Sequence, residues 1–392
     1  MSPETADLIV ERCRDLASDL SFADVAAWKA DNPAGRAIGV LPGYGPLELI
    51  RAAGCLPVGL IGGGDGLEII RGDAYFQSYI CHIPRSVVEL GLGGQLGALD
   101  GFVFPSTCDV IRNLSGMFQV LFADRYVKYF DVPQNFGPGL GGRFFRQELA
   151  DLARGLESIG AQPVTNESLA AAIAEYDARR AATETLLRLR IDHPEKVPAS
   201  EMTLLIWAGH RLPVDVHTAM LLEYTEGASQ RVARVRDNPR VMLHGAFCEQ
   251  PPLDLVRTLE RAGCYLVEDD FALQQRWIKG QILEDPTADP WDALTHAFLT
   301  RSRHSAIRYT PDGGKGEDIV ARVRNCQAEG VIFASPSFCD PSLLDLPMLT
   351  TALDDAGIPW TSFKYAENTG QFQGIREQAG TFSDSIRLWS EA

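Results

Sequence analysis

The sequence predicts an α/β protein with two similar, open lobes of mainly parallel β-sheet that are joined by a helical segment. Three observations predict this fold. Short apolar runs alternate with helical stretches towards both ends of the chain, the region between them is helical throughout, and the two ends share a sequence pattern. We expect an N-terminal lobe with a leading helix at 1–145, a helical connecting layer at 146–236 and a C-terminal lobe at 237–392.

The N-terminal lobe begins with a polar, amphipathic helix over 5–31. Strands are predicted where short apolar runs are ended by Pro and Gly, and the segment GPLELIRAAG between the first two has apolar residues at helical spacing. A strand, a helix and a strand at such short spacing are typical of a βαβ unit in a parallel sheet. The four predicted strands of this lobe are 36–42, 55–63, 100–106 and 126–133.

The central region is rich in Ala, Leu, Glu and Arg, as in NESLAAAIAEYDARRAATETLLRLRI, and we predict helices there. After it the strand pattern returns, and RAIGVLPGYGPLELIRAAGCLPVGL aligns with RVMLHGAFCEQPPLDLVRTLERAGCYLVED. DGFVFPSTCD likewise matches EGVIFASPSFCD, so we expect two related lobes that face each other across a cleft. The predicted strands of the C-terminal lobe are 240–246, 264–270, 330–336 and 358–365.

Charge and composition exclude several classes of function. The 392 residues have a formal net charge of −16, and a surface of that sign repels nucleic acid and anionic lipid. No apolar run reaches the roughly 18 residues of a membrane span, and the acidic N-terminus does not resemble a signal peptide. We therefore expect a cytoplasmic protein without nucleic-acid or membrane partners, whose eight cysteines are reduced.

Two of these cysteines, Cys108 and Cys339, follow predicted strands and precede an Asp. Ligands of open parallel sheets bind at the carboxyl ends of the strands, and a helix N-terminus there favours the thiolate that binds metal. Cys81, in the Tyr-rich segment DAYFQSYICHIPRS, is a third candidate. Three such thiolates fit a cubane iron–sulfur cluster better than zinc, because the close Cys pairs of structural zinc sites are lacking. The alternative for each cysteine is a small hydrophobic core residue.

The other five cysteines give weaker signals. Cys55 and Cys264 share an Ala-Gly-Cys context where a helix ends and a strand begins, which favours packing. Cys13 and Cys326 are expected on helices. Cys248, at a strand end in HGAFCEQPP, is left as a reserve ligand or a residue of a substrate pocket.

Several familiar motifs are incomplete. GGGDGLE at 62–68 is glycine-rich but lacks the spacing of a dinucleotide-binding loop. DGGKGED has Gly316 where an ATP-binding P-loop needs Ser or Thr, so we do not expect this chain to hydrolyse ATP. The histidines lack the H-E-x-x-H spacing of a metal site, and no G-x-S-x-G motif supports a hydrolase.

The cysteine segments resemble the 2-hydroxyacyl-CoA dehydratase and benzoyl-CoA reductase family over essentially the whole chain. The segments behind this resemblance are GDAYFQSYICHIPRS, FPSTCDVIRNLSGM, YFDVPQN, GAFCEQPPLDL, EGVIFASPSFCDP and FKYAENTGQFQGIREQAGTFSDS. The short motifs YIC, CDVIRN and YAENTGQ favour the reductase branch of the family over the dehydratases.

This resemblance implies an oxidoreductase subunit that holds a [4Fe-4S] cluster through Cys81, Cys108 and Cys339. It implies a heterotetramer in which a homologous, cluster-bearing subunit of the B type is the partner. A separate activator dimer binds and hydrolyses ATP, and ferredoxin supplies the electrons that reduce the ring of benzoyl-CoA to a cyclic dienoyl-CoA in anaerobic aromatic catabolism. The alternatives are a component of a 2-hydroxyacyl-CoA dehydratase and a non-catalytic structural subunit.

The substrate and its surroundings suggest further site residues. CoA phosphates need a local basic patch, although each candidate could instead form a structural ion pair; the candidates are Arg85, Arg112, Lys364 and Arg376. Aromatic residues beside the cysteines are expected either to form an apolar collar that limits water or to lie in the core; they are Tyr75, Phe76, Tyr79 and Phe338. Glu367 and Gln371 are placed near the cluster or the partner interface, and the proton donor stays unassigned.

Overall fold

The fold is described from a computed structural model, which describes residues 2–245, 251–270, 276–285, 287–306, 308–310, 314–366 and 372–390. The reserve ligand Cys248, with Glu367 and Gln371, lies outside these ranges. In the part of the chain that is described, no helix is long and apolar enough to cross a membrane.

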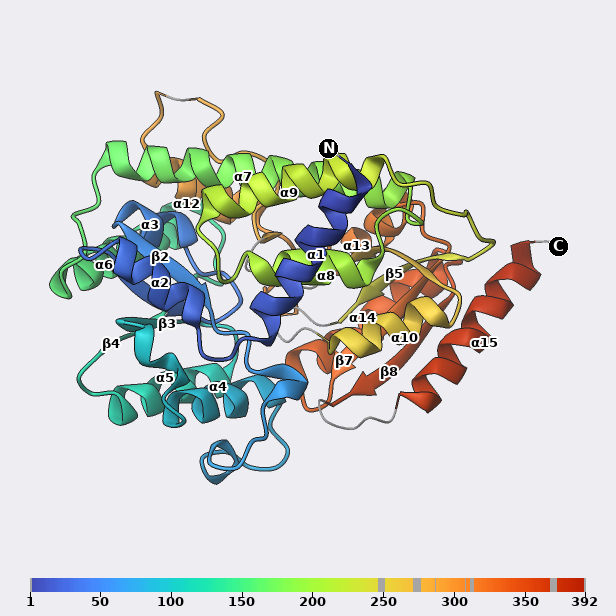
Figure 1. Ribbon diagram of the computed structural model, residues 1–392, viewed down its shortest axis with the longest axis horizontal. Coiled ribbons are helices and arrows are strands. Elements are labelled where there is room, and N and C mark those ends of the chain that lie inside the picture. Colours follow the sequence, from blue (N-terminus) through green and yellow to red (C-terminus); the bar gives the residue numbers. More distant parts are fainter. Residues whose placement is uncertain are drawn as a thin grey trace.

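Two four-stranded parallel sheets form the centres of the two lobes, in blue to cyan and in yellow to red in Figure 1. The strand orders are β2-β1-β3-β4 and β6-β5-β7-β8, so the lobes share one topology and the predicted fold class is confirmed. The strands are β1 (Arg36–Val40), β2 (Cys55–Gly59), β3 (Gly101–Pro105), β4 (Tyr126–Phe130), β5 (Arg240–His244), β6 (Tyr265–Asp269), β7 (Gly330–Pro336) and β8 (Trp360–Tyr365).

Both faces of each sheet are buried, as is usual for parallel sheets. In β3, Phe102 and Val103 belong to different apolar clusters, because successive side chains point to opposite faces. In β7, Val331 and Ile332 alternate in the same way. The covering helices of the lobes are α3 (Leu47–Ala52), α4 (His82–Leu92), α5 (Asp109–Leu121), α10 (Leu253–Arg261), α12 (Pro290–Arg301), α13 (Gly314–Asn325), α14 (Asp340–Asp355) and α15 (Gln373–Ser390).

The leading helix predicted over 5–31 is interrupted. Phe22 has a left-handed backbone (φ 56°), and the Asp19 carboxylate accepts hydrogen bonds from the N–H groups of Ser21 and Ala23. The result is two helices, of which the first packs against α8 and α9. The remaining helices are α1 (Pro3–Ser18), α2 (Ala23–Asp31), α6 (Arg143–Ser158), α7 (Asn166–Asp192), α8 (Ala199–Ala208) and α9 (Val214–Ser229).

The long helix α7 runs along both lobes in Figure 1 and contacts α3 in the first and β6 in the second. At each contact, a buried arginine of α7 forms an ion pair with a carboxylate of the lobe. Arg180 Nη1 donates to Glu48 Oε1 of α3 at 2.6 Å. Ten positions further along α7, Arg190 Nη2 lies 2.8 Å from Asp269 Oδ2 of β6. One helix therefore joins the two lobes through buried arginines.

Candidate functional site

The three cysteines singled out by the sequence occupy the same kind of position, the residue just before a helix. Cys81 precedes α4, Cys108 precedes α5 and Cys339 precedes α14. Cys339 is buried and the other two are half-buried. Cys108 follows β3 and Cys339 follows β7, which are the equivalent strands of the two sheets. The expected placement at strand ends and helix starts is confirmed for this pair.

Both of these strand ends lie where the chain order of the sheet reverses, the point at which open α/β folds bind ligands. The loops there pack closely. A Cβ at Gly43, after β1, would come within 2.8 Å of Thr107 Cγ2, and one at Gly245, after β5, within 2.9 Å of Ser335 Oγ. Both glycines have positive φ, of 146° and 116°. Because Gly43 and Gly245 lack a side chain, the segment after β1 or β5 can pack closely against the segment that leads to Cys108 or Cys339.

The electrostatic setting of Cys108 differs from the expectation of a thiolate favoured by the helix N-terminus. Burial is the largest influence and raises the pKa of the Cys108 thiol, although the N–H groups of Ile111 and Val110 act in the opposite direction. The unligated residue is thus a thiol at neutral pH. The two N–H donors at the start of α5 would stabilise the negative sulfur of a metal thiolate.

The residue before Cys339 has an unusual backbone. Phe338 has φ 66°, in the left-handed region that non-glycine residues rarely adopt, and its side chain is 50% exposed. Such strain persists only where the surrounding structure imposes it, and it is concentrated at functional sites. The turn after β7 is therefore fixed in a costly conformation directly at the cysteine.

The loop that leads to Cys81 is clamped by α4. Glu89 accepts hydrogen bonds from the N–H groups of Ile70, Arg71 and Gly72 at 2.6–2.9 Å. Burial alone would raise the pKa of Glu89, but these donors lower it. Ser86 accepts a further bond from the Gly63 N–H at 2.8 Å. Side chains of the helix that begins after Cys81 thus fix the backbone that precedes it.

The residue types at these positions suit an iron–sulfur cluster, since each supplies a thiol and Cys108 also has N–H groups directed at its sulfur. A cluster also requires the three thiols to lie close together. Within the described ranges, no three His, Cys, Asp or Glu side chains converge as a metal site. The three thiols stand at the starts of three different helices.

Four other cysteines are buried. Packing was expected for Cys55 and Cys264, and Cys13 lies on α1 as expected, whereas Cys326 lies one residue after the end of α13. Burial raises the pKa of Cys55 to about 12 and that of Cys264 to about 11, so both stay protonated and unreactive. The buried set comprises Cys13, Cys55, Cys264 and Cys326, each at most 2% exposed.

The residues proposed to surround the substrate have mixed outcomes. Arg85 forms an ion pair with Asp73 at 2.8 Å, which is the structural alternative for that residue. The other three basic candidates, Arg112, Lys364 and Arg376, are exposed on α5, β8 and α15. The expected apolar collar is not closed within this chain, and of the four aromatic residues Phe76 packs against an apolar core. Tyr75, Tyr79 and Phe338 are 39%, 62% and 50% exposed, while Phe76 is half-buried.

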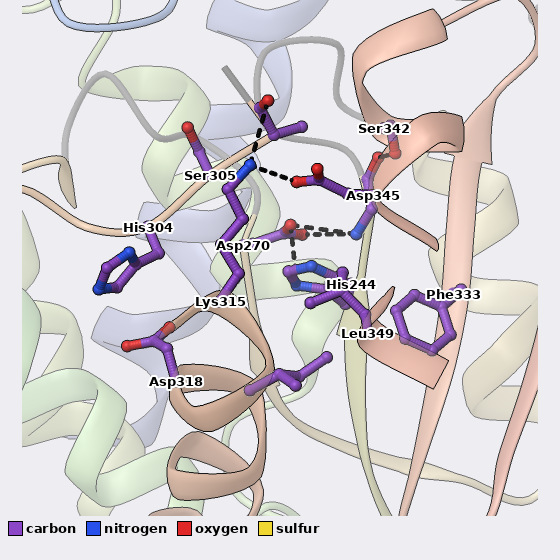
Figure 2. Close-up of a pocket in the computed structure, with 13 residues that line it drawn as sticks. His244, Asp270, His304, Ser305, Lys315, Asp318, Phe333, Ser342, Asp345 and Leu349 are labelled. Carbon is purple, nitrogen blue, oxygen red and sulfur yellow. Dashed lines mark hydrogen bonds and ion pairs between the residues drawn. The ribbon is translucent and has the colours of Figure 1, made fainter. Parts of the chain in front are cut away.

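A polar pocket in the second lobe went unrecognised in the sequence (Figure 2). It lies at the carboxyl ends of β5 and β6 and between α13 and α14, and its cavity volume is about 20 Å³. At its centre His244 Nδ1 lies 3.0 Å from Asp270 Oδ2. Lys315, in the DGGKGED segment, donates to Asp345 Oδ2 at 2.7 Å, so this lysine has an ion-pair role. Local patterns miss the pocket because six separate segments line it.

Comparisons with known proteins identify relatives along nearly the whole chain. The chain is 48% identical over 387 residues to the C-type subunit of benzoyl-CoA reductase of Thauera aromatica, covering 98% of this chain and all of that relative. It is 28% identical over 366 residues to the beta subunit of (R)-2-hydroxyglutaryl-CoA dehydratase of Acidaminococcus fermentans, covering 92% and 95%. A family model described as 2-hydroxyglutaryl-CoA dehydratase, D-component, matches residues 42–386. The chain therefore belongs to the 2-hydroxyglutaryl-CoA dehydratase D-component family.

Proposed function

We propose that this chain is the C-type subunit of an ATP-dependent benzoyl-CoA reductase. The observation that supports this most strongly is the 48% identity to the C-type subunit of benzoyl-CoA reductase over nearly the full length of both chains. The chain is then an oxidoreductase subunit that acts with a homologous partner subunit. The enzyme would add two electrons and two protons to the aromatic ring of benzoyl-CoA and release a cyclic dienoyl-CoA.

The cofactor in this proposal is a [4Fe-4S] cluster held by Cys81, Cys108 and Cys339. Bound there, it would supply low-potential electrons, which ferredoxin and an ATP-hydrolysing activator dimer deliver. The chain itself fixes the ligands. Glu89 anchors the loop before Cys81, and the N–H groups of Val110 and Ile111 face the sulfur of Cys108. The exposed Tyr79 and Phe338 beside two of the ligands would limit water once the partner covers them.

Reaction stoichiometry tests the activity. A reductase consumes two electrons, with ATP, for every benzoyl-CoA it converts, whereas a dehydratase of the same family needs electrons only to start its cycle. The complete complex should therefore oxidise about two equivalents of reduced ferredoxin per dienoyl-CoA formed. Rapid dehydration of a 2-hydroxyacyl-CoA with catalytic amounts of reductant would support the second candidate function, which the 28% identity to a dehydratase subunit keeps open.

Iron content tests the ligands independently of turnover. The single variants Cys81→Ser, Cys108→Ser and Cys339→Ser, purified anaerobically with the partner subunit, should each lose the cluster of this chain and its EPR signal. The matched controls are Cys55→Ser and Cys264→Ser, which change buried cysteines of the two cores and should keep their iron. Full iron and sulfide contents in the Cys108 and Cys339 variants would overturn the ligand assignment.

A further inference from the structure

A hydroxyl beside one candidate ligand is buried without a partner. Thr107, the residue before Cys108, is 7% exposed, and its Oγ1 atom is enclosed with no hydrogen-bond partner among the described residues. Buried polar atoms of folded proteins are nearly always paired, because an unpaired atom loses its hydration without replacement. The Thr107 hydroxyl therefore needs an explanation.

The side chain of Thr107 is held in one orientation. Its methyl group fills the space opposite Gly43, where an added Cβ would come within 2.8 Å of Thr107 Cγ2. The Thr107 N–H donates a hydrogen bond to the Pro105 carbonyl at 2.8 Å, which fixes the backbone of the turn. A β-branched side chain has few rotamers. The methyl contact and the turn together fix the direction of the hydroxyl.

The hydroxyl acts on the sulfur of Cys108. Burial is the largest influence on this thiol and raises its pKa, whereas the N–H groups of Ile111 and Val110 and the hydroxyl of Thr107 lower it. A neutral thiol is a weak acceptor, so the unligated cysteine leaves the hydroxyl unpaired. A thiolate carries the charge that makes a strong acceptor. The donor is therefore matched to Cys108 in the form that binds metal.

These donors stay with the cysteine wherever the other candidate ligands lie. Thr107 is its neighbour in the chain, and Val110 and Ile111 belong to the first turn of α5, which Cys108 precedes. The Arg112 N–H donates to the Cys108 carbonyl at 3.1 Å and fixes this residue to the start of the helix. The arrangement is therefore a local property of the turn and not of the grouping of the three thiols.

The second lobe shows that the fold does not require this hydroxyl. The turns after β3 and β7 begin alike, since the Ser106 N–H donates to the last residue of β4 at 2.9 Å and the Ser337 N–H to the last residue of β8 at 2.6 Å. The next residue is Thr107 in the first lobe and Phe338 in the second, which has no polar side-chain atom. A strand therefore leads into a cysteine and a helix without a hydroxyl at this position.

We propose that the Thr107 hydroxyl donates a hydrogen bond to the Cys108 sulfur when this cysteine holds an iron–sulfur cluster, and that it raises the reduction potential of that cluster. This inference rests on the cofactor of the proposed function. Reduction by one electron makes the thiolate ligands more negative. A hydrogen bond to one of them then stabilises the reduced form more than the oxidised form. Thr107 is a positioning residue, because it acts on the cluster through Cys108.

The variant Thr107→Val tests this role, because valine removes the hydroxyl and keeps a β-branched side chain. Purified anaerobically with the partner subunit, it should keep the wild-type iron content. In a redox titration followed by EPR, the ratio of reduced to oxidised cluster at the wild-type midpoint potential should fall about tenfold, which is about 59 mV for one electron. The signal of this chain is the one lost in Cys108→Ser, and the signal of the partner subunit is the internal reference.

Two further variants separate the hydrogen bond from packing. Thr107→Ser keeps the hydroxyl and should bring the potential back towards that of the wild type. The matched control Thr183→Val removes another buried hydroxyl, which donates to the Arg179 carbonyl of α7 at 2.9 Å, and should leave the potential unchanged. In the iron-free chain the Thr107 hydroxyl is unpaired, so Thr107→Val should not lower the midpoint of denaturant unfolding.

An unchanged potential in Thr107→Val with full iron content would overturn the inference. So would an equal shift in Thr183→Val, or a shift in Thr107→Val that comes with iron loss and that Thr107→Ser does not reverse, because those patterns are structural. If Cys108→Ser removes neither iron nor an EPR signal from the complex, the ligand assignment of the proposed function fails, and the role of Thr107 fails with it.

Discussion

The two lobes have the same strand order but differ at the edge where their strands end. The first lobe ends β1 and β2 in Val40 and Gly59 and adds two of the three candidate ligands, Cys81 and Cys108. The second lobe has one, Cys339, and a buried polar pocket around His244. The shared fold provides an equivalent position for a cysteine after β3 and β7. The side chains around that position differ: the first lobe has a second candidate cysteine, and the second lobe has a buried polar pocket. The two lobes of one chain are therefore expected to have different roles.

The lobes also differ in how they are attached to α7. In the first, Glu48 is 1% exposed and has Arg180 as its ion-pair partner. In the second, Asp269 is shared between Arg190 and Arg276, at 2.8 and 3.3 Å. A buried carboxylate with one arginine depends on it entirely, whereas a carboxylate with two keeps a partner when one is removed. The first junction should therefore be the more sensitive.

Arg180→Met should lower the free energy of unfolding by about 3–5 kcal/mol, because it leaves Glu48 buried and uncompensated. Arg190→Met should cost clearly less, about 1–2 kcal/mol, since Asp269 keeps Arg276. Denaturant unfolding of the two variants, measured side by side, checks the difference.

The double variant Arg180→Met/Glu48→Met separates lost pairing from lost packing. It removes the charges of Arg180 and Glu48 and should recover part of the stability, because well-packed apolar replacements of a buried ion pair are often neutral. The recovery is incomplete because the buried Asp177, which also pairs with Arg180, loses that partner. Asp177 still accepts the N–H groups of Ile282 and Leu283 in that variant. Equal losses in the two single variants would contradict the distinction between the junctions.

Much of the fold was predictable because its signals are local or repeated. The strand centres and the central helices follow from apolar periodicity, and the repeated strand–helix–Ala-Gly-Cys pattern predicts two related lobes. The interruption of the leading helix was not predictable in this way. It depends on the left-handed backbone of Phe22 and on hydrogen bonds to Asp19, which leave the apolar spacing unchanged.

Parts of the candidate site were likewise predictable from local sequence, and other parts were not. Cys108 and Cys339 were placed correctly because Cys-Asp after a strand marks a helix start within a few residues. The pocket around His244 joins side chains from distant segments, so no window of sequence contains it. The aromatic residues beside the cysteines were ambiguous for another reason. Hydrophobicity alone does not say whether Tyr79 lies in a core or on a surface left for a partner.

The turns before the two equivalent cysteines give the finest comparison between the lobes. Phe338 precedes Cys339 with φ 66°, whereas Thr107, which precedes Cys108, is not among the described residues with positive φ. Phe338→Gly should raise the free energy of unfolding by about 0.5–1 kcal/mol, because glycine removes a strain of about 1–2 kcal/mol and returns part of it as backbone entropy. Thr107→Gly should instead lower it by about 1–2 kcal/mol, since it loses a buried side chain that contacts Gly43.

The control is Phe338→Ala, which removes the half-exposed ring but keeps the left-handed strain. It should be no more stable than the wild type, so a gain seen only with glycine identifies the backbone as its source. Iron content of Phe338→Gly, measured anaerobically with the partner, shows what the strain does. Since a rigid turn holds Cys339 in one position, relaxing it should lower cluster retention while stability rises. Gains in both would mean that the left-handed turn serves neither stability nor ligand placement, and the two lobes would then differ here without consequence.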